Sequence, residues 1–155
     1  MQLHHYLSML RHAEGTLADA LRDTAAHHHD EVDVAMLCER LADQCDGHML
    51  ALEPFSERFR ADGEDRSEDE PDRLYSDLFH GNRSGPLGLL RDLHDLYLMV
   101  AECDITWTLV GQAAQGARDE ELVDVVGRCE GETATQLAWL RTRLKAAAPQ
   151  ALVVA

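Results

Sequence analysis

The chain has few aromatic residues, a single lysine and no long run of apolar residues. Aromatic residues make up 5% of its 155 positions, and this scarcity, beside abundant alanine and leucine, favours helices over β-sheets. No stretch approaches the ~20 consecutive apolar residues that a membrane-spanning helix requires. The first residues contain no cationic start followed by an apolar run, so we expect no secretory signal peptide and a cytoplasmic protein.

Positive charge and paired cysteines are also scarce. The formal net charge of −15 argues against nucleic acid and anionic membranes as partners, because both require a basic surface. The four cysteines form no CxxC pair, and in a reducing compartment we expect free, buried thiols. The sequence has no phosphate-binding loop, dinucleotide fingerprint or nucleophile elbow. No catalytic residue and no organic-cofactor site are therefore predicted, which favours a protein without enzymatic activity.

Apolar residues recur with helical period in four long segments, over residues 3–28, 31–60, 86–116 and 119–147. Short turns separate the first two and the last two, so each pair is predicted to form an antiparallel hairpin. An acidic stretch, 61–85, joins the hairpins, and residues 74–79 within it are a candidate short docking helix. The chain 1–155 is therefore predicted to be a single all-α domain. Its expected form is an antiparallel four-helix bundle with one long crossover between the second and third helices.

A glutamate, Glu14, lies in the middle of an apolar row on the first helix. A shift of 88 positions superimposes the first helical pair on the second and places Glu14 on Glu102, which interrupts an apolar row of the third helix. The same shift places His48 of the second helix on Gln136 of the fourth. We expect antiparallel packing to bring these four residues to one level, as a polar layer between apolar layers. The two apolar rows contain Leu10, Leu17 and Leu21, and Leu98, Ile105 and Leu109.

The order of the helices, the crossover and the polar layer resemble the ferritin-like superfamily. The closest resemblance is to its YciE-type stress-protein branch, through HAEGTLADAL in the first helix and EGETATQLAWLRTRLK in the last. In di-iron members, two helices each give a Glu and the other two each give Glu-x-x-His. Glu14 and Glu102 match the single glutamates, and His48 matches one histidine. The remaining ligand positions are occupied by Cys45, Thr133 and Gln136. The resemblance therefore implies a degenerate di-iron motif without a full di-iron centre.

Three interpretations of the polar layer stay open from the sequence. In one, Glu14, His48 and Glu102 hold a single Fe, Mn or Zn ion with help from Glu132 or Gln136. In another, the layer is the relic of a metal site, and its groups bind one another and fix the helix register. In the third, an apolar row is wrongly assigned and one glutamate lies at the core boundary. The missing ligands favour a structural, interaction or stress-related module of reduced or absent activity, with a metalloprotein as the alternative.

The third helix carries a second apolar stripe, which points away from Glu102. A helix that is apolar on two sides has to be covered twice. We expect the second cover to come from residues 74–79 or from a second copy of the chain, and a homodimer is predicted. The stripe consists of Leu89, Leu93, Leu96, Val100, Cys103, Trp107 and Val110.

Overall fold

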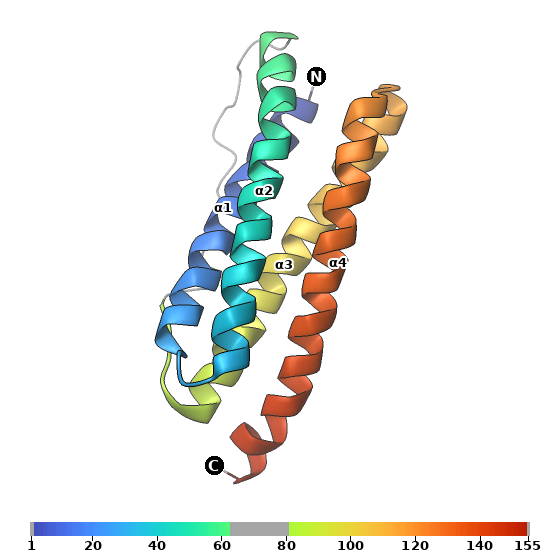
Figure 1. Ribbon diagram of the computed structural model, residues 1–155. Helices are drawn as coiled ribbons and strands as arrows, with labels where there is room; N and C mark the ends of the chain where they lie inside the picture. Colours follow the sequence, from blue (N-terminus) through green and yellow to red (C-terminus); the bar gives the residue numbers. More distant parts are fainter. Residues whose placement is uncertain (1, 63–80, 155) are drawn as a thin grey trace.

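The computed structural model describes residues 2–62 and 81–154, and this part of the chain contains helices and no strand. Four long helices lie side by side and form a bundle (Figure 1). They are α1 (Leu3–His27), α2 (Val32–Asp62), α3 (Gly85–Gly116) and α4 (Glu120–Pro149). One turn of π-helix, η2 (Gln150–Val154), follows α4. The four predicted helices agree with the observed ones to within two residues at every end. The predicted short helix 74–79 and most of the predicted crossover lie outside the described residues.

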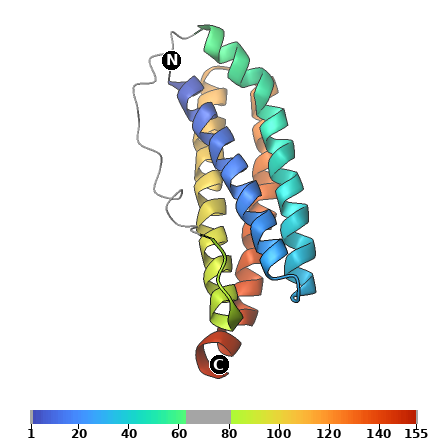
Figure 2. The same ribbon diagram turned by 90° about the vertical axis from the view of Figure 1, so that its left-hand side faces the viewer.

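The course of the helices is plain in two views of the ribbon. In Figure 1 the chain runs down α1, up α2, up α3 and down α4. The end of α2 and the start of α3 therefore lie at opposite ends of the bundle (Figure 2). Helix α1 packs against α2 and α3, whereas α4 packs mainly against α3 and makes fewer contacts with α2. No helix in the described ranges is both long enough and apolar enough to cross a bilayer.

The loop between α3 and α4 is one residue shorter than the loop between α1 and α2, since it spans 117–119 and the other spans 28–31. The backbone N–H groups of Arg118 and Asp119 donate to the carbonyls of Gln115 and Ala114 and close a Schellman motif. Asp119 then caps α4, because its carboxylate accepts a hydrogen bond from the backbone N–H of Leu122 at 3.1 Å. The Schellman motif ends α3 and Asp119 caps the start of α4, so three residues are enough for this turn.

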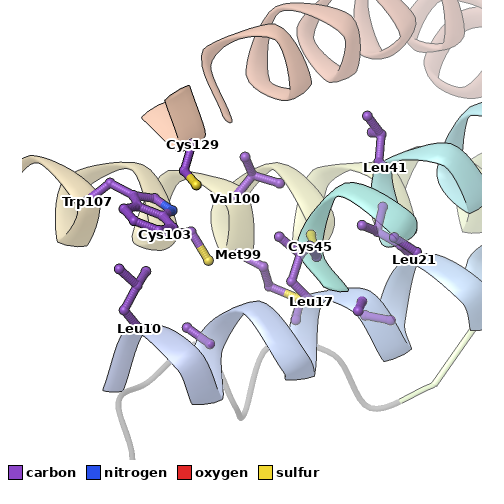
Figure 3. Close-up of a cluster of buried hydrophobic side chains, with 14 of the residues drawn as sticks. Leu10, Leu17, Leu21, Leu41, Cys45, Met99, Val100, Cys103, Trp107 and Cys129 are labelled. Atoms are coloured by element: carbon purple, nitrogen blue, oxygen red, sulfur yellow. The ribbon is translucent and has the colours of Figure 1, made fainter. Parts of the chain in front are cut away.

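The second apolar stripe of α3 faces the core of the same chain, so the expectation that it needs an additional cover is wrong. All seven of its residues are buried, and Figure 3 shows Val100, Cys103 and Trp107 among the side chains of the bundle interior. Close approach of α4 helps to cover this side, because a Cβ added at Gly111 would lie 2.9 Å from Val126 Cγ1. The face that remains open is the one predicted to be internal. Its residues are Leu98, Ile105 and Leu109, with exposed fractions of 39%, 52% and 47%.

The internal repeat needs two offsets rather than one. The offset of 88 matches buried positions of α2 with buried positions of α4, as it does for His48 and Gln136. Between α1 and α3 the matching offset is 89, which pairs Glu14 with the buried Cys103. The shorter second loop accounts for the difference, because it removes one residue between the hairpin's two helices. The prediction that Glu102 is the internal counterpart of Glu14 is therefore wrong by one residue.

Candidate functional site

A buried carboxylate, Glu14 of α1, is the centre of the candidate site. Its side chain is 1% exposed, and one oxygen, Oε1, receives two hydrogen bonds. Trp107 Nε1 of α3 donates to this oxygen at 2.8 Å, and His48 Nδ1 of α2 lies 3.1 Å away. An ionised carboxylate only accepts, so Nδ1 of His48 carries the proton and donates. Three helices are thereby joined at one oxygen atom.

The other ring nitrogen of His48 points toward α4. Its Nε2 lies 3.4 Å from Glu132 Oε1, within ion-pair range but without the geometry of a hydrogen bond. The side chain of Glu132 is 39% exposed, so the row from Glu14 through His48 to Glu132 leads from the core to the surface. Two buried atoms, Glu14 Oε2 and His48 Nε2, have no hydrogen-bond partner among the described residues.

The charge of His48 depends on its two acidic neighbours. Burial opposes the charged imidazolium, but hydrogen bonding to Glu14 and the charges of Glu14 and Glu132 outweigh burial and raise the pKa of His48. The ring also meets Trp107 edge to face, with 5.6 Å between the ring centroids. The indole and the two carboxylates therefore fix both the orientation and the protonation of this histidine.

One helical turn from His48 and Glu132, the layer continues with uncharged groups. Gln136, which is buried, donates from Nε2 to Gln44 Oε1 at 3.0 Å and joins α4 to α2. Thr133 turns its hydroxyl back to the carbonyl of Cys129 at 2.8 Å, so it is satisfied within its own helix. The positions at which a di-iron motif has Glu and His thus carry groups that bond to the protein itself.

Three buried thiols, those of Cys45, Cys103 and Cys129, lie in the bundle interior (Figure 3), and the charge of Glu14 acts on each of them. Burial raises the pKa of Cys45, and the charge of Glu14 raises it further. Burial likewise raises the pKa of Cys103, and that of Cys129 to about 11. The thiolate is the form that attacks and that binds metals. Near neutral pH these cysteines are protonated and pack as small apolar side chains.

The structure brings together four of the five predicted site residues and leaves one outside. Glu14, His48, Glu132 and Gln136 lie in or beside the layer. Glu102 is half-buried on the outer side of α3, next to Cys103, which takes the internal position. Its separation from the layer follows from the one-residue difference between the two loops. Glu102 is therefore withdrawn as a partner of Glu14.

The donor set does not fit a di-iron centre. Of the six ligands that such a centre uses, this layer offers Glu14 and His48, with Glu132 one position away from the expected site. In residues 2–62 and 81–154 no group of three or more His, Cys, Asp or Glu side chains is arranged to hold a metal ion. Catalytic zinc sites take three protein donors. The layer is thus better described as a hydrogen-bonded network.

Trp107 is the participant that the sequence interpretation missed. It belongs to the second stripe of α3, which was assigned to the outside of the bundle. A signal was present, because a buried indole requires an acceptor for its N–H, and Glu14 is the internal carboxylate of the facing helix. Placing the second stripe inside would have paired the two residues.

Together, the helices and the layer define an all-α four-helix bundle with a buried carboxylate–histidine–tryptophan network. Comparison with protein-family models, with curated proteins and with solved structures found no match to the chain.

Proposed function

We propose that the chain is a ferritin-like bundle without a di-iron centre, acting as a structural or interaction module rather than as an enzyme. The observation that carries the proposal is the pair of hydrogen bonds from Trp107 and His48 to one oxygen of Glu14. A carboxylate oxygen that accepts hydrogen bonds from two other helices fixes the register of three helices without an ion. The parallel course of α2 and α3, between two hairpins (Figures 1 and 2), supports the ferritin-like assignment.

Metal analysis and stability together test this proposal. Protein without an affinity tag is purified, treated with a chelator, and unfolded with urea in the presence and absence of Fe, Mn or Zn. We expect no stoichiometric metal and no change in the unfolding midpoint upon metal addition. Glu14→Ala should destabilise the chelated protein by roughly 3 kcal/mol, because it leaves buried donors unpaired. Metal at one equivalent per chain, lost in both Glu14→Ala and His48→Ala, would contradict the proposal.

A second candidate function is the binding of a single divalent ion between His48 and Glu132, at the outer end of the polar layer. The supporting observation is the 3.4 Å separation of His48 Nε2 and Glu132 Oε1. Two tetrahedral ligands at about 2.1 Å from one ion are themselves about 3.4 Å apart. Glu14 would then orient His48 through Nδ1, as carboxylates do for metal-ligating histidines. Only two protein donors meet there, which makes this candidate the weaker one. A Glu132→Gln variant separates the two, since it should abolish metal binding but leave the inner network intact.

We also propose that a second copy of the chain covers the open face of α3. The exposed side chains Leu98, Ile105 and Leu109 form an apolar row at helical spacing. A pocket of about 500 Å³ continues this row toward the start of α1 and is lined by Leu3, Tyr6 and Leu109 among others. A self-complementary apolar face of this kind favours a twofold dimer.

Light scattering with a matched pair of variants tests the dimer. Ile105→Glu should shift the mass from dimer to monomer, because a charge cannot be buried unpaired in an apolar interface. Met36→Glu serves as the control, since Met36 is an exposed apolar residue of α2 with an exposed fraction of 69%. A monomeric wild-type protein at micromolar concentration would count against a homodimer.

A further inference from the structure

A pocket outside the polar layer lies between the first half of α1 and the last turns of α2. These two segments lie side by side at the upper end of the bundle in Figure 1. The pocket has a volume of about 410 Å³, which is within the usual range for small-molecule sites. Its lining is polar and rich in hydrogen-bond donors. The residues that matter for its chemistry are His4, Arg11, His12, Ser56, Glu57 and Arg60.

Two buried polar atoms in this pocket lack a hydrogen-bond partner. Ser56 is 7% exposed, and its Oγ has no partner among the described residues. The same holds for the buried Nδ1 of His4. A buried hydroxyl without a partner is unfavourable by about 1–3 kcal/mol. A ligand that offers acceptor oxygens to Ser56 would remove this penalty.

Arg11 of the pocket is half-buried and Arg60 is exposed. The other half-buried arginines of the described residues, Arg22, Arg83 and Arg143, each pair with two or more acidic side chains. Within the described residues, Arg11 and Arg60 form no such ion pair. Arg11 is thus the one half-buried arginine of the described residues without an acidic partner, and Arg60 lines the same pocket.

We propose that this pocket binds a small anion that carries a phosphate group. Guanidinium groups match phosphate oxygens in pairs, and hydroxyl and imidazole groups donate to the remaining oxygens. A metal cation is excluded as the occupant, because both arginines stay charged. A nucleic acid is disfavoured by the net charge of −15. The volume exceeds that of inorganic phosphate and leaves space for a short organic group esterified to it.

The local arrangement also predicts which residue opposes binding. Glu57 is the one carboxylate among the lining residues in the described part of the chain. Its negative charge repels an anion at the pocket mouth. Removal of this charge should therefore tighten binding, whereas removal of either guanidinium should weaken it.

Titration calorimetry of the full chain with inorganic phosphate and with glycerol 3-phosphate tests the site. We expect saturable one-to-one binding that is weakened about tenfold or more in Arg11→Gln, Arg60→Gln and Ser56→Ala. Glu57→Gln should bind more tightly, an outcome that loss of folding cannot produce. Arg91→Gln is the matched control, because Arg91 is an exposed arginine of α3 and does not line the pocket.

The two ligands distinguish a free phosphate from a phosphate ester. Tighter binding of glycerol 3-phosphate supports an ester as the occupant, and equal affinities support recognition of the phosphate group alone. The proposal is overturned if neither ligand gives a saturable signal at tens of millimolar. It is equally overturned if Arg91→Gln weakens binding as much as Arg11→Gln does, since the effect would then reflect diffuse charge.

Discussion

At the scale of single residues, the indole N–H of Trp107 is the contact that decides how well Glu14 is accommodated. Burying an ionised carboxylate is tolerated only with compensating hydrogen bonds. Here Trp107 supplies the shorter of two bonds, at 2.8 Å.

We therefore predict that Trp107→Phe lowers the free energy of unfolding by about 2–4 kcal/mol. The loss combines one hydrogen bond to a charged acceptor with the smaller volume of the ring. Urea denaturation followed by circular dichroism measures it. Trp139→Phe is the matched control, since Trp139 is only partly buried and forms no hydrogen bond to Glu14. Equal losses in the two variants would show that ring volume, and not the N–H bond, matters.

The raised pKa of His48 predicts a pH dependence of stability. Because the folded-state pKa lies above the value of about 6.5 for an unfolded chain, the imidazolium binds its proton more tightly when folded. Its stabilising contribution is thus fully present below pH ~6.5 and is lost as the pH rises through the folded pKa.

Wild-type protein should therefore lose stability relative to His48→Gln as the pH is raised above ~6.5. The free energy of unfolding is measured at several pH values for both proteins, and the difference between them isolates His48. His94→Gln, at an exposed position of α3, should follow the wild-type curve. A wild-type curve parallel to that of His48→Gln would mean that Glu14 and Glu132 do not act on the ring.

At the scale of elements, hydrophobic period predicts the four helices but not which side of α3 is internal. Helix boundaries follow from local signals, such as Pro86 near the start of α3 and the acidic first turn of α4. The choice between the two apolar faces of α3 depends on rotation about its axis, which no local signal fixes. One residue of loop length rotates the matching register by about 100°, and this moves Glu102 out and Cys103 in.

The same limit explains which parts of the site were predicted. Glu14 and His48 lie on helices with one apolar face, so their burial could be inferred from α1 and α2 alone. Glu102 lies on the ambiguous helix, and its assignment depended on an exact repeat. Glu132 reaches His48 although its position is one residue early, because a long side chain spans the offset at the core boundary. Hydrophobic periodicity thus predicts the position of a side chain along the bundle axis better than the side of the helix on which it lies.

The short loop between α3 and α4 contains one residue with a strained backbone, and a substitution can relieve this strain. Arg118 has a φ of 56°, a left-handed conformation that residues other than glycine seldom adopt. Its side chain is exposed, so substitution removes no buried contact. Arg118→Gly should therefore raise the free energy of unfolding by about 0.5–1 kcal/mol. Arg118→Ala is the control and should give no comparable gain, since alanine retains the Cβ. A loss of stability in the glycine variant would argue that Arg118 contributes through its side chain.

At the scale of the whole molecule, α2 and α4 meet along a polar seam. The seam is formed by ion pairs at its two ends and by amide and imidazole groups between them. Arg143 donates to Asp33 at 2.7 Å near one end, and Arg58 pairs with Asp119 near the other. Between these, Gln44 meets Gln136 and His48 meets Glu132. The two hairpins are thus held together on this side by contacts that salt can screen.

Salt changes the stability of the folded chain in two opposing ways, and the relative size of the two effects predicts whether the thermal midpoint rises or falls. Screening weakens the seam, but exposed ion pairs contribute only about 0–1 kcal/mol each. Screening also relieves the mutual repulsion of a chain with net charge −15. That repulsion acts over the whole bundle at 0.01 M salt, where the Debye length is about 30 Å, and is short-ranged at 0.15 M, where it is about 8 Å.

Sodium chloride should therefore raise the thermal midpoint over this range in a buffer without phosphate. Asp23→Asn should have a higher midpoint than wild type at low salt and a smaller response to salt. It removes one exposed charge of α1 that lies four residues from Asp19, where like charges repel. Arg143→Gln makes the opposite change, because it loses the seam contacts and increases the net negative charge. A midpoint that falls with salt in wild type, but not in Arg143→Gln, would mean that the seam outweighs the repulsion.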